Sequence, residues 1–403
     1  MTSKNPLLEE AKFLQSELVC HRRYLHKNAE TGFSLQKTTE YVKTQLINMG
    51  YQVEELGNAG VVVCVGKAEK NTPVFLLRAD MDALPVPEEA DLEFASDNGN
   101  MHACGHDMHA TMLLGAAKLL KNHEQELNGQ VKLLFQAAEE TLQGAKSAIE
   151  NGALKKPSVD AALMIHTLTC LELETGCVLV SAPGVSAPTA DYFTIKVQGK
   201  GCHGSMPQEG VDALSAGAHI LLALQEISAR ELSINDSAVL TVGRMQAGNA
   251  GNVIADTAVL EGTMRCFDEP LRERLKKRLT EISAKIAAAF RADAETIFTS
   301  GCPTLVNDEK LAQFALETLP ALLGKDKVIS TAALPSSKSG ASEDFAYFSH
   351  EIPALMLALP AGEKSKGFRY PLHHPKALFD EDVLCLGSAV YAFTAIQWLN
   401  QAR

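Results

Sequence analysis

The chain has 403 residues, of which 46% are hydrophobic and 21% are charged, as in a globular protein with a sizeable core. Its formal net charge is −12 at pH 7, and the acidic residues are spread along the chain. This charge argues against nucleic acid or an anionic membrane as a partner.

The N-terminal segment lacks a basic start followed by an apolar stretch, so we expect no signal peptide. We also expect no membrane span, because no window approaches the roughly 18 apolar residues that a span requires. The nine cysteines include no Cys-x-x-Cys pair. This pattern predicts free thiols and a cytoplasmic protein.

The first part of the chain alternates helix and strand patterns. Apolar residues at helical spacing predict helices over 34–50, 106–123 and 145–152. Short apolar runs predict strands over 59–66, 73–80, 129–140 and 160–167. This order predicts an α/β domain with a mixed, mainly parallel sheet flanked by helices.

The pattern changes near residue 187. A strand of alternating polarity (187–201) begins a set of six elements in the order β-α-β-β-α-β, and the other five are expected over 211–230, 238–245, 257–266, 270–290 and 293–301. The first pattern then resumes, with elements expected over 308–323, 352–360 and 382–399. We therefore predict an α+β domain (187–303) inserted between two segments of the first domain (1–186 and 304–403).

Polar residues cluster where predicted strands of the first domain end. Asp80 and Asp82 follow one strand, Glu139 and Glu140 follow another, and His166 closes a third. Ligands of open α/β sheets bind beyond the carboxyl ends of the strands. Two adjacent carboxylates repel each other, so they need a cation or a proton between them.

The stretch MHACGHDMHA (101–110) adds sulfur and nitrogen ligands. Gly105 predicts that a helix begins at His106 and that the chain before it is extended, which places Cys104 and His106 on one face. Thiolate, imidazole and carboxylate together suit zinc or a similar ion. A nucleophilic cysteine beside a histidine is the alternative, but it leaves Glu139 and Glu140 without a role.

Seven segments in order carry a resemblance to a known family: RADMDALP, MHACGHDMHA, FQAAEE, GCHGSMPQEGVDA, GNVIADTAVLEGTMR, SEDFAYF and LHHP. They resemble the aminoacylase-like metallopeptidase superfamily, and most closely its amidohydrolase branch of N-acyl-amino-acid deacylases, hippurate hydrolases and plant auxin-conjugate hydrolases. The resemblance covers nearly the whole chain. It implies that the first domain is catalytic and that the insertion is a lid that also forms a dimer.

The resemblance also implies two divalent ions per subunit, which could be zinc, manganese, cobalt or nickel. Cys104 would be the ligand shared between the ions, and the other ligands would be His106, Glu140, His166 and His373. His373 is preferred to His374 because it lies two residues before Pro375.

Glu139 would be the general base. Asp80 and Asp82 would support the ligands from behind, and Asp80 aligns better with the supporting aspartate of the family. His109 and Asp107 lie on the predicted helix, where we expect them to pack or to support the ligands. His102 receives no role.

Three residues of the inserted domain match residues that act on the substrate in the family. His203 would reach the active site of the partner subunit and stabilise the oxyanion, and Asn252 and Arg265 would hold the carboxylate of the substrate. The implied reaction is hydrolysis of the amide bond of a small N-acyl or N-aroyl amino acid by metal-activated water. The implied assembly is a homodimer, or a larger homo-oligomer, formed through the lid.

Two alternatives remain open. The same machinery could serve a dipeptidase or carboxypeptidase, although a dipeptidase needs a group that receives a free α-amine and the sequence identifies none. The chain could also be a non-catalytic metal-binding dimer on the same fold.

Overall fold

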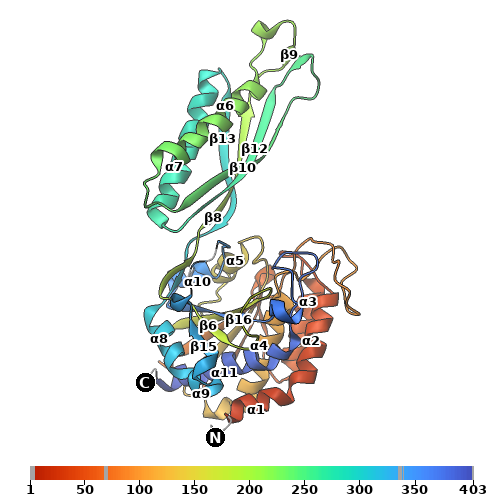
Figure 1. Cartoon of the computed structure of the whole chain (residues 1–403), viewed down its shortest axis with the longest axis vertical. Helices are drawn as coiled ribbons and strands as arrows, with labels where there is room; N and C mark the ends of the chain where they lie inside the picture. The colour runs from red at the N-terminus through yellow and green to blue at the C-terminus, as the bar shows by residue number, and fades with distance from the viewer. Residues whose placement is uncertain (1–4, 68–70, 335–337, 339, 402–403) are drawn as a thin grey trace. The chain divides into compact units, whose positions relative to one another are not determined.

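The computed structural model describes residues 5–67, 71–334, 338 and 340–401. The chain divides into two compact units, which Figure 1 draws together. The first unit contains the described residues of 1–186, 306–338 and 344–403, and the second contains those of 187–305 and 339–343. The predicted insertion was 187–303.

The first unit is built on an eight-stranded sheet in the order β1-β2-β4-β3-β5-β16-β6-β15. Its strands are β1 (Glu54–Glu55), β2 (Gly60–Gly66), β3 (Val74–Asp80), β4 (Gln130–Gln136), β5 (Ala161–Leu168), β6 (Val178–Val180), β15 (Val328–Ser330) and β16 (Ala354–Pro360). Strand β3 is parallel to β4 and β5, and β16 is parallel to β5. Strand β2 is antiparallel to β4, and β6 is antiparallel to β16. The predicted mixed α/β fold is therefore confirmed.

Helices cover both faces of this sheet. They are α1 (Pro6–Phe13), α2 (Gln15–Lys27), α3 (Gln36–Asn48), α4 (His106–Asn122), α5 (Gly144–Glu150), α8 (Glu309–Thr318), α9 (Pro320–Leu323), α10 (Ala346–Glu351) and α11 (Leu384–Gln401). Helices α4 and α11 pack on each other and on β3, whereas α5 packs on β4. Because side chains alternate along a strand, Phe75 and Leu77 enter the core with α4 and α11, and Arg78 points to the opposite face.

The last helical segment bears on the expectation that the chain has no membrane span. Glu381–Gln401 is long enough to cross a membrane and has a mean hydropathy of 1.3, although no such segment was predicted. In the structure 67% of it is buried within the protein. Helix α11 packs against α4, α1 and β3, so its apolar surface serves the core of the first unit.

The second unit has its own core. Strands β8 (Ala190–Gln198), β10 (Ala238–Ala247), β12 (Thr257–Cys266) and β13 (Asp293–Cys302) form an antiparallel sheet in the order β10-β12-β8-β13, which leaves β10 at one edge. Helices α6 (Ala213–Glu226) and α7 (Glu269–Ala289) pack on this sheet. The chain order is β-α-β-β-α-β, as predicted.

Two further strand pairs are short. Strands β9 (Cys202–His203) and β11 (Val253–Ile254) pair within the second unit. Strands β7 (Gly184–Ala187) and β14 (Leu305–Asn307) pair at the residues where the chain changes unit.

Candidate metal centre

Cys104 and His106 reach the site through a turn followed by the first residue of a helix. Helix α4 begins at His106, as predicted, but the preceding residues form a turn closed by a hydrogen bond from the Gly105 N–H to the His102 carbonyl (3.1 Å). The prediction of an extended entry was therefore wrong. Gly105 has φ 81°, and a β-carbon there would lie 2.5 Å from Thr167 Oγ1. Only glycine fits this conformation and this close approach.

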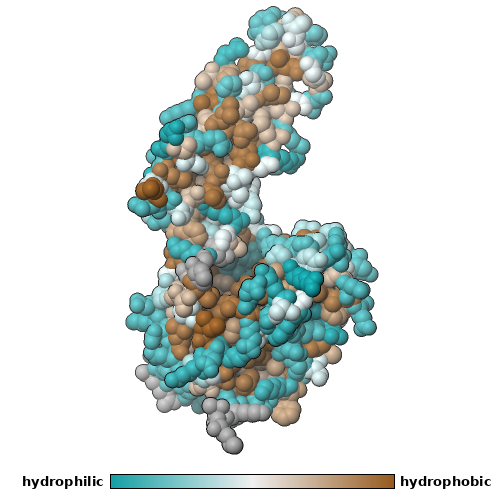
Figure 2. Space-filling view, viewed as in Figure 1, coloured by the Kyte–Doolittle hydropathy of each residue, from teal (hydrophilic) through white to brown (hydrophobic). Residues whose placement is uncertain are grey.

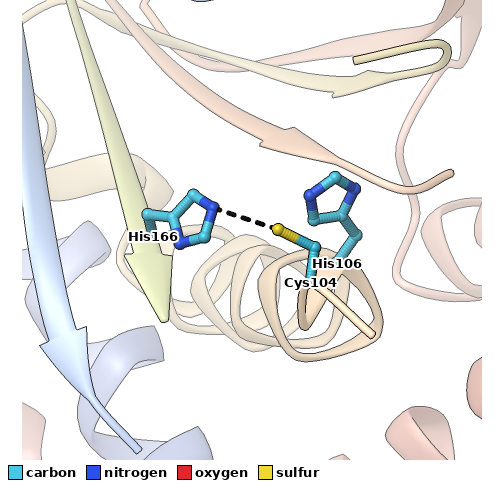
Figure 3. Close-up of side chains that lie close together, drawn as sticks. All are labelled: Cys104, His106 and His166. Atoms are coloured by element: carbon cyan, nitrogen blue, oxygen red, sulfur yellow. Dashed lines mark hydrogen bonds between the residues drawn. The ribbon is translucent and has the colours of Figure 1, made fainter. Parts of the chain in front are cut away.

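One group of three ligand atoms contains Cys104, His106 and His166 (Figure 3). His166 projects from β5, and its Nε2 lies 3.6 Å from Cys104 Sγ. The three ligand atoms lie within 4.8 Å of one another. Ligands of one tetrahedral zinc ion are roughly 3.3–3.8 Å apart, given bond lengths of about 2.0–2.3 Å. The Cys104–His166 distance fits this geometry.

A second group shares Cys104 and adds Glu140 and His373. His373 Nε2 lies 3.3 Å from Cys104 Sγ and 3.6 Å from Glu140 Oε1. Glu140 Oε1 lies 3.8 Å from His106 Nε2, so the two groups are contiguous. All five predicted ligands thus come together, and Cys104 is the residue common to both groups.

Three buried polar atoms of these groups lack a hydrogen-bond partner in the described part of the chain. These atoms are the two ring nitrogens of His106 and the Oε1 atom of Glu140. All three are buried, and none forms a hydrogen bond with another described residue. Buried polar groups are nearly always satisfied, so such atoms need an unseen partner. A sulfur, nitrogen and oxygen donor set of this composition fits zinc or a similar divalent transition metal.

The electrostatics of the cluster point the same way. Burial raises the pKa of the Cys104 thiol well above its usual range, and burial also raises the pKa of Glu140 to about 7. Both groups resist ionisation in the protein alone because their charges would be desolvated. A divalent cation offsets this cost and displaces their protons. The site is therefore suited to a metal and poorly suited to a free nucleophilic thiolate.

Hydrogen bonds behind the cluster orient its members. His166 Nδ1 donates to the Thr167 carbonyl (2.7 Å), which leaves the lone pair of Nε2 directed at the site. Asp82 accepts from the backbone N–H groups of Glu139 (3.0 Å) and Glu140 (3.2 Å) and lies 3.6 Å from His106 Nδ1. Asp80 also lies near this ring, 3.8 Å from His106 Nδ1, so the structure places both predicted aspartates behind the ligands.

Glu139, the candidate base, is buried beside the ligands. A carboxylate oxygen of Glu139, a ligand atom of His106 and a ligand atom of Glu140 lie within 4.8 Å of one another. Glu139 Oε1 accepts from the backbone N–H of Asp344 (3.3 Å). This carboxylate is thus held next to the metal ligands without being needed to complete either group of ligands.

The backbone is strained at two positions in this region. Ala138, just before the two glutamates, has φ 59°, and the ligand His373 has φ 66°. Such left-handed conformations are uncommon for residues other than glycine and cluster at functional sites. A hydrogen bond from the His373 N–H to the Ala103 carbonyl (2.9 Å) ties the loop to the turn that carries Cys104.

Sequence reasoning missed a buried polar network next to the ligands. Arg78 contacts Asp80, Asp344 and Gln136, and Asp80 accepts from His109. A charged residue inside the apolar run 73–79 was the available signal, but the sequence alone did not show what neutralises it.

The three candidate residues of the second unit lie in two places. His203 and Asn252 are exposed and adjacent, since β9 pairs with β11 and the Gly204 N–H donates to the Asn252 carbonyl (2.8 Å). Arg265 lies near the far end of β12, where it donates to Ser342 Oγ (2.9 Å). Eight strand residues separate Thr257, at the Asn252 end of β12, from Arg265, which corresponds to about 26 Å.

The ring of His203 is held in a defined tautomer. The Ser205 backbone N–H donates to His203 Nδ1 (3.1 Å), and Ser205 Oγ lies 2.7 Å from the same nitrogen. Since a backbone N–H can only donate, Nδ1 is an acceptor and the proton of the neutral ring is on Nε2. His203 therefore presents an N–H donor away from its own backbone.

Comparison with known proteins gives a consistent picture. Residues 76–397 match the model of Peptidase family M20/M25/M40. The chain is 36% identical to an N-acetyl-L-cysteine deacetylase from Bacillus subtilis, over 93% of this chain and 86% of that protein. It is 36% identical to IAA-amino acid hydrolase ILR1-like 2 from Arabidopsis thaliana (94% and 84%). It is 35% identical to thermostable carboxypeptidase 2 from Saccharolobus solfataricus (98% of both).

Solved structures are similar along their whole length. A putative aminohydrolase from methicillin-resistant Staphylococcus aureus matches with a TM-score of 0.87 and 31% identity, over 98% of this chain and 99% of that one. The YXEP protein of Bacillus subtilis, described as a dinuclear metal-binding peptidase of the M20 family, matches with a TM-score of 0.76 and 30% identity (96% and 99%). The resemblance seen in the sequence and the prediction of an amide hydrolase are confirmed, and the chain belongs to peptidase family M20/M25/M40.

Proposed function

We propose that the protein is a metal-dependent amidohydrolase that cleaves the amide bond of N-acyl or N-aroyl amino acids. The observation that carries this proposal is the pair of ligand groups that share Cys104 and have Glu139 beside them. Relatives named for N-acetylcysteine deacetylation and for hydrolysis of indoleacetyl amino acids support the substrate class.

The ligands suit two divalent ions, with zinc, manganese, cobalt and nickel as the candidates. Cys104, His106 and His166 would hold one ion, and Cys104, Glu140 and His373 the other. When bound, the ions supply Lewis acidity, which polarises the amide carbonyl and makes water a stronger acid.

The chain supplies the proton transfers. Glu139 takes a proton from the attacking water and passes it to the nitrogen of the leaving amine. The Asp344 N–H donates to this carboxylate, and Asp82 holds the residue by accepting from its backbone N–H. His203 would donate its Nε2–H to the oxyanion of the tetrahedral intermediate, and its tautomer is already the one that this role requires.

Substrate binding would involve Asn252 and Arg265, whose groups suit a free carboxylate. Arg265 lies about 26 Å along β12 from Thr257, the residue at the Asn252 end of that strand, so we propose that Asn252 and Arg265 of a single chain do not contact the same small substrate. We therefore assign His203 and Asn252 to the site of a partner subunit and Arg265 to the site of its own chain.

The second unit also offers a surface for dimer formation. Strand β10 is an open sheet edge, and large apolar side chains are exposed on it and on α6, namely Val239, Leu214 and Leu222. Figure 2 shows hydrophobic surface on this unit among hydrophilic residues. Open edges and exposed apolar patches of this kind are typical of protein contacts. We propose a homodimer through this unit.

The nine cysteines support a reducing compartment. All of them lie in the described residues, and all are free thiols. This usage fits a cytoplasmic enzyme.

A carboxypeptidase or dipeptidase with the same machinery is the second candidate, and the similarity to a thermostable carboxypeptidase favours it. The test is to strip the enzyme of metal, reconstitute it with each of the four ions, and assay N-acetyl amino acids, N-benzoyl amino acids and dipeptides. We expect metal-dependent release of the amino acid from N-acyl substrates. Faster cleavage of dipeptides would favour the second candidate, and absence of any cleavage would overturn both.

A further inference from the structure

Arg78 is a buried cation at the carboxyl end of β3, and its guanidinium group contacts two carboxylates. A series of hydrogen bonds starts at each carboxylate: the first branch starts at Asp80 and the second branch at Asp344. Arg78 is fully buried and donates to Asp80 Oδ2 (2.6 Å) and to Asp344 Oδ1 (2.7 Å). Its Nε donates to Gln136 Oε1 (3.0 Å), and Gln136 Nε2 in turn donates to Asp344. The planar fork of arginine fixes the relative positions of the two carboxylates.

The first branch leads to a metal ligand. Asp80 Oδ1 lies 2.6 Å from His109 Nδ1, and the Thr167 backbone N–H donates to His109 Nε2 (2.8 Å). Because that N–H can only donate, Nε2 is an acceptor and Nδ1 carries the proton that is donated to Asp80. His109 thus holds the backbone of Thr167, whose carbonyl fixes the ring of the ligand His166.

The second branch leads to the candidate base. The Asp344 side chain is held by Arg78, by Gln136 and by the backbone N–H of Ala145 (2.8 Å). The backbone N–H of the same Asp344 donates to Glu139 Oε1. Fixing the Asp344 side chain therefore fixes the donor that aims the Glu139 carboxylate.

We propose that Arg78 is a shared positioning residue, which orients the metal ligand His166 through Asp80, His109 and Thr167, and the general base Glu139 through Asp344. The identity of Glu139 as the base rests on the proposed function, whereas the link to His166 rests only on the metal centre. A buried cation that served the fold alone would not need both branches to end at groups of the site.

The two branches predict different defects, which separates positioning from folding. Replacing His109 with Leu removes the first branch, and we expect the dissociation constant for metal to rise roughly 10- to 100-fold, as for other groups that orient ligands. With saturating metal its kcat should stay close to that of the wild type. His109→Gln can still accept from Thr167 and should recover part of the affinity.

Replacing Asp344 with Ala removes the second branch. We expect kcat to fall by about 100-fold, as for a displacement of a reacting group by about 1 Å, with KM and metal affinity unchanged. Asp344→Asn is the milder variant if the alanine variant does not fold. Lys132→Met is the matched control, since Lys132 is a buried cation on the neighbouring strand β4 that donates to the Lys155 carbonyl (2.7 Å) and, within the described part of the chain, has no hydrogen bond or ion pair with a residue of the site.

The experiment measures metal affinity by competition with a chelator, and kcat and KM on an N-acyl amino acid, for all variants and the control. The inference is supported if His109→Leu loses metal affinity and Asp344→Ala loses kcat while Lys132→Met changes neither. Unchanged metal affinity in His109→Leu, or unchanged kcat in folded Asp344→Ala, overturns it. Should the wild type cleave no N-acyl amino acid, the proposed function fails, and the metal-affinity result still decides the inference.

Discussion

The two units carry their candidate functional residues in opposite ways. In the first unit Cys104, His106, His166 and Glu139 are buried, the ligand atoms of each group lie within 4.8 Å of one another, and further polar groups hold them from behind. In the second unit His203 and Asn252 are exposed near the Thr257 end of β12, and Arg265 lies about 26 Å from Thr257 along that strand. The candidate residues of the first unit come together within one chain, whereas those of the second unit lie in two separate places.

This difference indicates which candidate residues we expect to depend on dimer formation. Preorganised groups in a buried site need no reorganisation at the moment of reaction, and the first unit provides this on rigid strand ends. The second unit carries its candidate residues in two separate places, and we propose that His203 and Asn252 act on the site of a partner subunit. Variants of the first unit should therefore fail in every assembly, whereas variants of His203 should be rescued by another chain.

The largest effect is expected from Glu139→Gln. The amide keeps the shape of the side chain but cannot accept a proton, so we predict a loss of kcat of at least about 1,000-fold. Metal content should not change, because Glu139 is needed in neither group of ligands. Steady-state kinetics and elemental analysis on the same sample check this, and retained turnover would remove the base assignment.

The next largest effect is expected from His203, and it tests whether the second unit acts on the site of the partner subunit. We predict that His203→Ala lowers kcat by roughly 100- to 1,000-fold, as for loss of an oxyanion donor. Mixing the inactive Glu139→Gln and His203→Ala proteins should restore about a quarter of wild-type activity, because half of the dimers are mixed and each has one intact site. No recovery after subunit exchange would place His203 in its own chain's site.

A smaller effect is expected from Arg265. Its guanidinium would pair with the substrate carboxylate, so Arg265→Ala should raise KM by roughly 10- to 100-fold, the range for a hydrogen bond to a charged group. Substrates whose carboxylate is converted to an amide should lose the same factor in the wild type and little in the variant. Equal losses in both proteins would show that Arg265 binds another part of the substrate.

The smallest effect is on stability in the first unit. His26 donates to Asp107 (2.8 Å) and lies 2.9 Å from Glu88. Burial opposes protonation of His26, but the carboxylates of Asp107 and Glu88 outweigh both it and the charge of Arg22, so the pKa of His26 lies above its usual value of 6.5. A raised pKa stabilises the fold below the unfolded pKa, and this stabilisation is lost as pH rises through the folded pKa.

We therefore predict that His26→Gln is destabilised most at about pH 5.5 and that its difference from the wild type shrinks at about pH 9. Calorimetric melting at both pH values, with metal held in excess, measures this difference. A difference that grows with pH would contradict the assignment of a protonated His26.

The sequence predicted much of the fold and the ligand set, for physical reasons that the structure makes clear. Buried strands are short apolar runs, and the carboxyl ends of parallel strands meet at one edge of a sheet. The sequence alone therefore predicts that Asp82, Glu139 and His166 lie close together. The shape of the Cys104 turn could not be predicted, because it depends on the close approach of Gly105 to Thr167. The sequence also could not predict the partner of Arg78, since Asp344 is 266 residues away in sequence.

Anomalous diffraction from crystals of the metal-loaded wild-type protein tests the central claim most directly. We predict two metal peaks per chain. One ion should be held by His106 and His166, the other by Glu140 and His373, and Cys104 Sγ should be bonded to both. Cys104→Ala should lose both peaks or retain them only weakly. A single peak, or two peaks of which only one contacts Cys104, would contradict a centre built around a shared cysteine.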